Sequence, residues 1–549
     1  MKPSNMNRDE SPPRPPTSTF SNLSEDLKLD VFDFVRSKSD QGNARLVSQE
    51  WNRLMRPAMW RDFTTSLRGS FANDLHKPSE QQLVCFHDIR ALAVGGKHVG
   101  SDYEACFSSF MRLLRSDQLL HFTSAKETPL KMVQLLSILR QQKNLRSFRA
   151  RLDLSNTASE DKASWTTEQT SLVTSALRAL TSLRIYFKNG SSADNGHEME
   201  CSSSLVKAAP LLDCLEICGW RPTPNWREVW GPRIDPIPPT ALFGNTAILN
   251  HIPRKLRHLL LADANLSGVE TTLLSALDCA TLCSLKLEYC DKIVPFLQAL
   301  TTSIQQTGTQ LKVLTIRTRN DEIAGDNDCT REVRDLLSSF GGLEELELDY
   351  MWCGYLDWKA TLRTHRTLKK FEIGSGHLGD GHPLWTERIA AALNQCPNLQ
   401  YFIYSPTRLT SGYILDCQIP GSLPMGLVES LDVVAATPTL RKLRLLTAPG
   451  LSEDRINRRD PAWVQKASDM AQGVATLVLT HLYLKGSNIQ LLILSPSSRW
   501  KQAHNDRNQH YYPHYCYRLQ TVDYKGKKLI IAAPLRDYIA EYPDAAIFV

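Results

Sequence analysis

Long apolar runs are absent from this sequence of 549 residues. No stretch approaches the roughly 18 consecutive apolar residues that a membrane-spanning helix needs. The first twenty residues also lack the apolar core of a secretory signal peptide. We therefore expect a chain that is neither inserted in a membrane nor secreted.

Charge of one sign is also scarce. Lys and Arg total 64 against 58 Asp and Glu, so the net charge is only +6. This small excess predicts neither a nucleic-acid partner nor an anionic membrane surface. The 13 cysteines have irregular spacing and no secretory signal, which favours reduced thiols in the cytoplasm or nucleus and excludes a secreted disulfide scaffold.

Catalytic and metal-binding signatures are missing as well. The sequence contains no Gly-x-Ser-x-Gly, no Walker A sequence and no Gly-x-Gly-x-x-Gly between a strand and a helix, so we expect no catalysis and no cofactor. Neither Cys214 with Cys218 nor Cys279 with Cys283 has a matching second pair. Near the C-terminal end, four residues of zinc-ligand type lie close together: His504, His510, His514 and Cys516. Their spacing matches no zinc finger. We therefore expect no metal there and an aromatic surface segment instead.

The N-terminal region combines a proline-rich tail with short helices. Residues 1–20 contain five prolines and few apolar groups, which predicts disorder. From Ser24, a good N-cap, the spacing of Leu23, Leu27 and Val31 predicts an amphipathic helix. A second helix is predicted over 43–54, and Pro57 is expected to open a further helical turn. Such a small module buries little surface, so either a partner completes it or it caps the rest of the chain.

The order of residues in this module resembles the F-box. The shared features begin with Leu-x-x-x-Leu at 23–27 and an apolar-Phe pair at 31–32. They continue with Val-Ser at 47–48 and Trp51, and they end with Pro-x-x-Trp at 57–60. Ser24, Asp26 and the pair Gln41-Gly42 depart from the family pattern. The resemblance implies binding to a Skp-type adaptor and, through it, to cullin and RING subunits. The implied contact residues are Leu23, Leu27, Val31, Phe32, Val35, Leu46, Val47, Trp51, Leu54 and Trp60.

A second pattern repeats through the body of the chain. The motif Leu-x-x-Leu-x-Leu, with apolar substitutions, begins at an early degenerate copy, Ile89, and recurs with first anchors at Leu145, Leu180, Leu212, Leu256, Leu282, Leu311, Leu343, Leu368, Leu399, Leu440 and Leu479. The gaps from Leu256 to Leu399 are 26, 29, 32, 25 and 31 residues. These values lie at or just above the roughly 20–29 residues of a leucine-rich repeat.

This periodicity predicts an α/β fold. Short strands would pair with their counterparts in neighbouring repeats while alternate leucines face one continuous core. Helical spacing between the motifs, at 294–306, 329–340 and 384–396, predicts a curved solenoid with parallel strands on its concave side. An all-helical amphipathic array is the alternative. The unit at 279–293 resembles the cysteine-containing class of leucine-rich repeats, which implies a structural role for Cys279, Cys283 and Cys290, and for Cys218.

The resulting domain prediction has four parts. Residues 1–20 form the tail, 21–67 the helical module, 68–500 the solenoid with an insertion at about 219–250, and 501–549 a capping segment. The insertion carries Trp220, Trp226 and Trp230, which predict either a partner-binding loop or rings that pack the loop onto the solenoid. The sequence KGKK at 525–528 predicts a hairpin turn.

The two resemblances together imply a non-catalytic substrate-recognition subunit of an SCF-type ubiquitin ligase. The F-box would bind the adaptor, and the repeats would bind a protein substrate whose identity the sequence does not reveal. The alternative is a leucine-rich-repeat interaction scaffold with no role in ubiquitination.

Overall fold

The structure is a computed structural model. It describes residues 23–33, 35, 38–66, 78–95, 101–125, 128–153, 166–188, 202, 204–220, 256–268, 270, 273–274, 277–317, 327–348, 356–373, 384–404, 422–446, 461–495 and 516–535.

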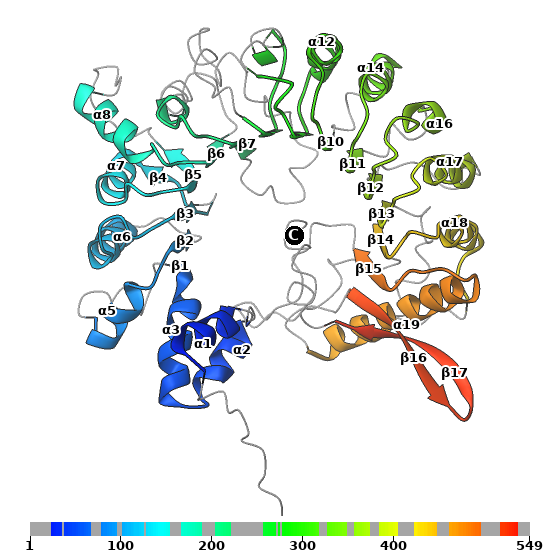
Figure 1. The fold of residues 1–549 in the computed structure, drawn as a ribbon, viewed down its shortest axis with the longest axis horizontal. Helices are drawn as coiled ribbons and strands as arrows, with labels where there is room; N and C mark the ends of the chain where they lie inside the picture. The colour runs from blue at the N-terminus through cyan, green and yellow to red at the C-terminus, as the bar shows by residue number, and fades with distance from the viewer. Residues whose placement is uncertain are drawn as a thin grey trace, which may run out of the picture.

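A single curved sheet of 17 strands runs through the molecule, with helices along its outer rim (Figure 1). Neighbouring strands from β1 to β15 pair in parallel, as expected when helices or turns connect successive strands. The strands are β1 (Asp62–Ser66), β2 (Ala91–Gly95), β3 (His121–Ser124), β4 (Leu130–Lys131), β5 (Ser147–Asp153), β6 (Ser182–Lys188), β7 (Cys214–Trp220), β8 (His258–Ala262), β9 (Ser284–Glu288), β10 (Val313–Arg317), β11 (Glu345–Leu348), β12 (Lys370–Ile373), β13 (Tyr401–Tyr404), β14 (Lys442–Leu446), β15 (Leu491–Ser495), β16 (Cys516–Tyr524) and β17 (Lys527–Pro534).

The repeated leucine motif sets the register of this sheet. The second anchor of each copy lies directly opposite the second anchor of the next, as Leu285, Leu314 and Leu346 do in β9, β10 and β11. These side chains are fully buried, whereas the residues between the anchors point to the concave side because strand side chains alternate. The structure is therefore a leucine-rich-repeat solenoid, and the predicted parallel α/β architecture is confirmed.

Helices cover the core from outside. The predicted helical segments at 294–306, 329–340 and 384–396 are confirmed as α12, α14 and α17, so the all-helical alternative is wrong. The outer helices are α5 (Glu80–Phe86), α6 (Ser101–Leu113), α7 (Met132–Gln141), α8 (Thr167–Ala176), α12 (Ile293–Thr307), α14 (Asn327–Ser338), α16 (Trp358–Thr361), α17 (Leu384–Leu393), α18 (Met425–Ala435) and α19 (Pro461–Leu484).

One predicted copy of the motif was wrong. Leu479, Leu482 and Leu484 lie in the long helix α19, because a spacing of three also suits one face of a helix. The strand that continues the sheet is β15, which carries Leu492 and Leu494 in register with β14. Two copies also escaped prediction, in β1 and β3, because Thr65 and Ser124 occupy their third anchor positions.

The N-terminal module consists of α1 (Glu25–Asp33), α2 (Lys38–Arg45) and α3 (Gln49–Arg61). The predicted continuous helix over 43–54 was wrong, because Ser48 stops it: its Oγ accepts a hydrogen bond from the Trp51 amide (3.1 Å) and caps α3. Pro57 does not open a new turn but lies within α3. The helix leads directly into β1, so the sheet begins inside the range predicted for the module, 21–67.

An antiparallel hairpin, β16–β17, ends the sheet. β16 pairs with β15, so the last parallel strand does not have an open edge. Tyr517 lies opposite Leu492 and is fully buried. The hairpin turn falls at Lys525 and Gly526, both with positive φ, as the KGKK sequence predicts.

The cysteines of the repeat unit at 279–293 are buried. Cys290 is completely inaccessible, and its Sγ lies 3.3 Å from the carbonyl oxygen of Leu261. Cys218 differs from it: it lies within β7, opposite Ala262 of β8, rather than in the turn after the strand. The ten cysteines in the described part of the chain are all free thiols.

A buried histidine makes stability depend on pH. His365 Nε2 lies 2.8 Å from the Leu337 carbonyl oxygen and Nδ1 faces the Leu343 amide (3.4 Å), so the neutral ring that donates from Nε2 and accepts at Nδ1 fits both partners. Burial lowers the pKa of His365, although the bond to Leu337 opposes this change. In the unfolded chain the His365 imidazole binds a proton near its ordinary pKa of about 6.5, whereas the folded protein binds it only at lower pH. The free energy of unfolding therefore falls as pH drops below about 6.5.

We therefore expect a smaller fall in unfolding free energy between pH 7.5 and 5.5 for His365→Gln than for wild type. Urea unfolding at both pH values measures this difference. A fall of equal size in the two proteins would contradict the assignment.

Candidate functional site

Three helices form a small core of their own at one end of the solenoid. Phe32, Leu54 and Met55 are buried there, and the Trp51 ring meets the Phe32 ring edge-on at 5.1 Å. Ion pairs hold α1 against α3: Lys28 binds Glu50 and Arg53 binds Glu25, both at 2.7 Å. The module is thus stabilised independently of the solenoid core.

The structure divides the predicted adaptor-binding residues into three groups. Phe32 and Leu54 belong to the module core, while Val35 and Trp51 are half-buried against it. Trp60 instead packs against the solenoid, stacking on Phe63 at 5.1 Å. The exposed members are Leu23, Leu27, Val31, Leu46 and Val47.

The exposed members lie in two places. Leu27 and Val31, four residues apart, share one face of α1, where Leu27 is 52% and Val31 44% exposed, and Leu23 lies just before the helix begins. Leu46 and Val47 lie in the turn between α2 and α3, at 85% and 62% exposure. Apolar side chains this accessible on so small a module indicate a surface that a partner can cover.

Two departures from the F-box pattern, Gln41 and Ser24, make hydrogen bonds within the module. Gln41 is buried, and its Nε2 donates to the Val35 carbonyl oxygen at 2.7 Å, so it ties α2 to the end of α1. Gly42 faces open space. Ser24 Oγ lies 3.4 Å from the Leu27 amide, at the start of α1. None of these residues intrudes on the exposed face of α1.

The concave side of the sheet is a second candidate surface. The residues between the second and third anchors form one row across the strands, in register from β5 to β14. In this row lie Arg149, Arg184, Glu216, Leu260, Lys286, Thr315, Glu347, Glu372, Ile403 and Arg444. Sequence reasoning missed this row, although its signal is simple: each member is the middle residue between two apolar anchors of a motif copy.

Charges cluster in the central part of the row. Arg317 forms ion pairs with Glu347 and with Glu372, the latter at 3.4 Å. Burial raises the pKa of Glu372 and Glu347 raises it further, whereas Arg317 and Lys370 lower it. Lys370, whose pKa burial lowers, lies 3.8 Å from Glu345. These acidic and basic side chains therefore largely neutralise one another.

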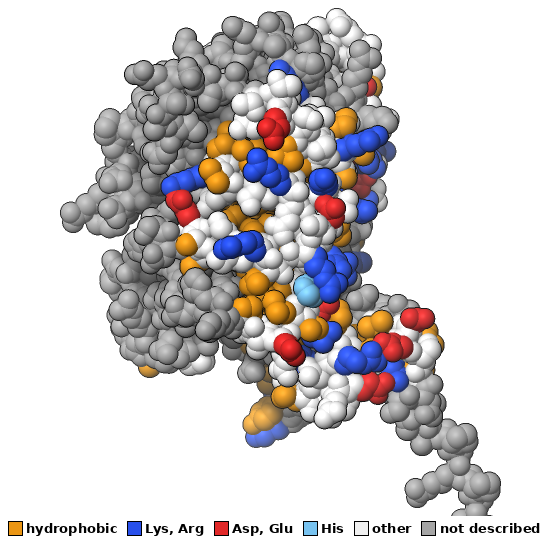
Figure 2. Space-filling view, turned by 90° about the vertical axis from the view of Figure 1, so that its left-hand side faces the viewer, with side chains coloured by type: hydrophobic (Ala, Val, Ile, Leu, Met, Phe, Trp, Pro, Cys, Tyr) orange, Lys and Arg blue, Asp and Glu red, His pale blue; other side chains and the backbone are white. Residues whose placement is uncertain are grey.

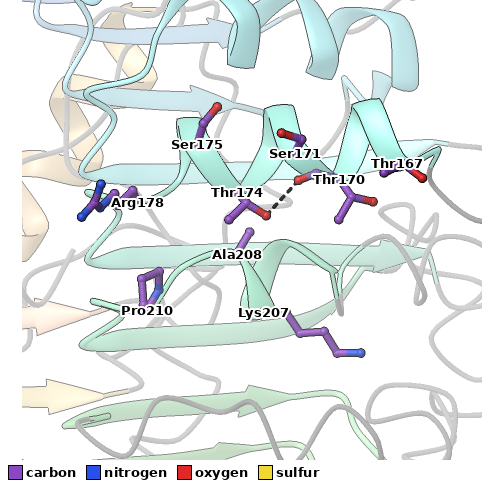
Figure 3. Close-up of a pocket in the computed structure, with 9 residues that line it drawn as sticks. All are labelled: Thr167, Thr170, Ser171, Thr174, Ser175, Arg178, Lys207, Ala208 and Pro210. Atoms are coloured by element: carbon purple, nitrogen blue, oxygen red, sulfur yellow. Dashed lines mark hydrogen bonds between the residues drawn. The ribbon is translucent and has the colours of Figure 1, made fainter.

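The outer face offers a groove of about 900 Å³ between α8 and the short helical segment 204–207 with the turn that follows it (Figure 3). Thr167, Thr170, Ser171 and Thr174 line one side of it. Its two cations, Arg178 and Lys207, point toward opposite ends rather than converging (Figure 3). On the outer surface around this groove, cationic, anionic and apolar side chains are scattered without a patch of one kind (Figure 2).

Several predicted features fall outside the described residues. Trp220 ends β7, but its side chain and all of Trp226 and Trp230 lie outside them. The same holds for the three tail histidines, His504, His510 and His514, whereas Cys516 is buried in β16. Within the described part of the chain, no group of His, Cys, Asp or Glu could hold a metal ion, and no helix is long and apolar enough to cross a membrane.

Comparison with known proteins identifies no family for this chain. No family model matches the chain. No curated protein matches it either. Among solved structures, a leucine-rich repeat-containing protein of Legionella pneumophila, LegL7, is similar at 9% identity with a TM-score of 0.32, covering 74% of this chain and 97% of that one. The fold assignment therefore rests on this chain's own strand register and recurring leucine motif.

Proposed function

We propose that this chain is the substrate-recognition subunit of an SCF-type ubiquitin ligase, in which α1–α3 bind a Skp-type adaptor and the solenoid binds a protein substrate. One observation carries the proposal: Leu27 and Val31 are exposed on α1 while their neighbour Phe32 is buried in the module core. The module thus folds around its own core and still presents apolar side chains to a partner. Exposed apolar side chains that lie together are typical of a surface that binds another protein.

The connection between the module and the solenoid supports a receptor. The helix α3 passes into β1 without a linker, and Arg56 on α3 binds Asp88 beyond α5 at 3.0 Å. Trp60 and Phe63 join the two parts by ring stacking. A substrate on the solenoid would keep a fixed orientation to the adaptor, which raises the effective concentration of its lysines at the conjugating enzyme.

Replacing the exposed α1 residues tests the proposal. We expect the double variant Leu27→Asp, Val31→Asp to lose capture of a co-expressed Skp-type adaptor, because charge at the centre of an apolar interface leaves unpaired, desolvated carboxylates. The control is Val133→Asp on α7, a side chain that is 79% exposed and distant from the module. Thermal unfolding verifies that all three proteins remain folded.

Equal adaptor capture by the double variant would contradict the assigned surface. Failure of the folded wild type to capture any adaptor would favour the second candidate function, an interaction scaffold. The charged row on the concave side supports that candidate as much as it supports a receptor, because both functions need a surface that binds protein.

A further inference from the structure

Arg149, a cation on the concave side, has no counter-charge among the residues that the structure describes. Arg149 lies on β5 in register with Thr123 of β3 and Arg184 of β6. All three occupy the row of middle residues on the concave side. Two guanidinium groups are thus carried side by side on strands roughly 4.8 Å apart, an arrangement that is unfavourable in the absence of an anion.

The neighbouring arginine, Arg184, already has an ion-pair partner. Arg184 forms an ion pair with Glu216, the residue opposite it on β7. It also donates a hydrogen bond to the Tyr186 hydroxyl at 3.3 Å. The single carboxylate of this part of the row is therefore engaged with Arg184 and does not neutralise both arginines.

Arg149 itself has no hydrogen-bond acceptor or ion-pair partner among the described residues. It is half-buried, and burial lowers its pKa, with the positive charge of Arg184 adding to the effect. Withdrawing a guanidinium from water without an acceptor costs free energy. A protein retains such a group at small benefit to its own stability, which points to a ligand that supplies the acceptor.

We propose that the concave side at β5–β6 binds an acidic peptide segment, with the Arg149 guanidinium donating hydrogen bonds to a carboxylate or phosphate of that segment. The planar fork of Arg149 suits either group, since both can accept two parallel hydrogen bonds. Thr123 lies opposite Arg149 on β3, and Tyr186, two residues beyond Arg184 on β6, carries a second hydroxyl nearby. The site lies on β5 and β6, apart from the exposed face of α1, so the inference is independent of adaptor binding.

The outer groove is a weaker candidate for the same chemistry. Its cations, Arg178 and Lys207, diverge (Figure 3), and Thr174 already donates to the Thr170 carbonyl oxygen at 2.8 Å. Arg149 and Arg184 instead sit in register on adjacent strands. The concave position therefore has the geometry that an anionic group requires.

Fluorescence anisotropy with the full chain, without adaptor, tests the site. The probes are labelled eight-residue peptides of alternating Gly and Glu, the same peptide with phosphoserine in place of Glu, and a Gly-Gln control. We expect wild type to bind at least one anionic peptide and not the Gly-Gln peptide. Arg149→Gln should weaken that binding at least tenfold, because it removes the charge and the fork.

The matched control is Arg140→Gln, an exposed arginine on α7 that should bind like wild type. Arg149→Gln should also unfold at a temperature equal to or above that of wild type, since it removes an uncompensated charge; a merely structural arginine would lower it. Preference for Glu or phosphoserine identifies the group recognised. Unchanged binding by Arg149→Gln, equal binding of Gly-Gln, or binding of free inorganic phosphate without either peptide would overturn the proposal.

Discussion

Replacing Phe402 by alanine is expected to lower the free energy of unfolding by about 3–5 kcal/mol. Phe402 is fully buried in β13, and its ring lies 5.8 Å from Phe371 in the preceding strand and 5.0 Å from Tyr404. It occupies the second-anchor position that every repeat contributes to the core. Its removal leaves a cavity that strands fixed by register on both sides cannot fill by shifting.

Urea unfolding followed by circular dichroism measures this loss. The control is Tyr524→Ala near the tip of the hairpin, where the ring is 57% exposed and the expected change is below about 0.5 kcal/mol. Because each repeat contacts only its neighbours, the Phe402 variant should also broaden the transition as the C-terminal repeats unfold first. A loss no larger than that of Tyr524→Ala would contradict the core assignment.

Replacing Arg317 by methionine is expected to lower the free energy of unfolding by about 3 kcal/mol at pH 8. This change leaves Glu347 and Glu372 side by side and unopposed, at 14% and 11% side-chain exposure. Removing one partner of a buried ion pair costs more than the pair contributes, because the remaining charge stays desolvated. Lys370 compensates for this only in part, since its pKa is itself lowered by burial.

The cost should depend on pH. In wild type, burial and Glu347 raise the pKa of Glu372, and Arg317 limits that rise. Without Arg317 the pKa of Glu372 rises further, so the folded variant binds a proton more readily than the unfolded chain. Stability from such a group is present at low pH and is lost as pH rises through its folded pKa.

The difference between wild type and Arg317→Met should therefore be smaller at pH 5 than at pH 8. Chemical unfolding of both proteins at the two pH values provides the measurement. The matched control, Lys312→Met, removes a lysine that is 58% exposed and paired with Glu344 at the surface, and should change stability little at either pH. A cost for Arg317→Met that is constant across pH would contradict the proposed coupling to Glu372.

Most of the solenoid could be predicted because its signal is repeated. A single Leu-x-x-Leu-x-Leu segment is ambiguous, but its recurrence fixes which residues enter the core and hence the register. The same reasoning failed at Leu479, where a spacing of three was produced by a helix, and at Ser124, where a buried hydroxyl took an anchor position. Ser124 is accommodated because its Oγ donates to the Thr128 carbonyl oxygen at 2.5 Å.

The candidate sites were less accessible to sequence reasoning. The sequence pattern of the module does not distinguish residues that contact a partner from residues of the module core. Only the packing of α1 on α3 shows that Leu27 is exposed and Phe32 is buried. The position of Arg149 could not be predicted, because its neighbours among the described residues depend on the strands on either side of it. Cross-strand neighbours are set by register between repeats, which a single motif does not reveal.

The most direct measurement is the mass of the complex formed when the wild-type chain is co-expressed with a Skp-type adaptor and analysed by size-exclusion chromatography with light scattering. The receptor account predicts one peak whose mass equals one copy of each chain, and a peak of the free chain when Leu27 and Val31 are replaced by aspartate. Separate peaks for a folded wild-type chain and the adaptor would contradict it.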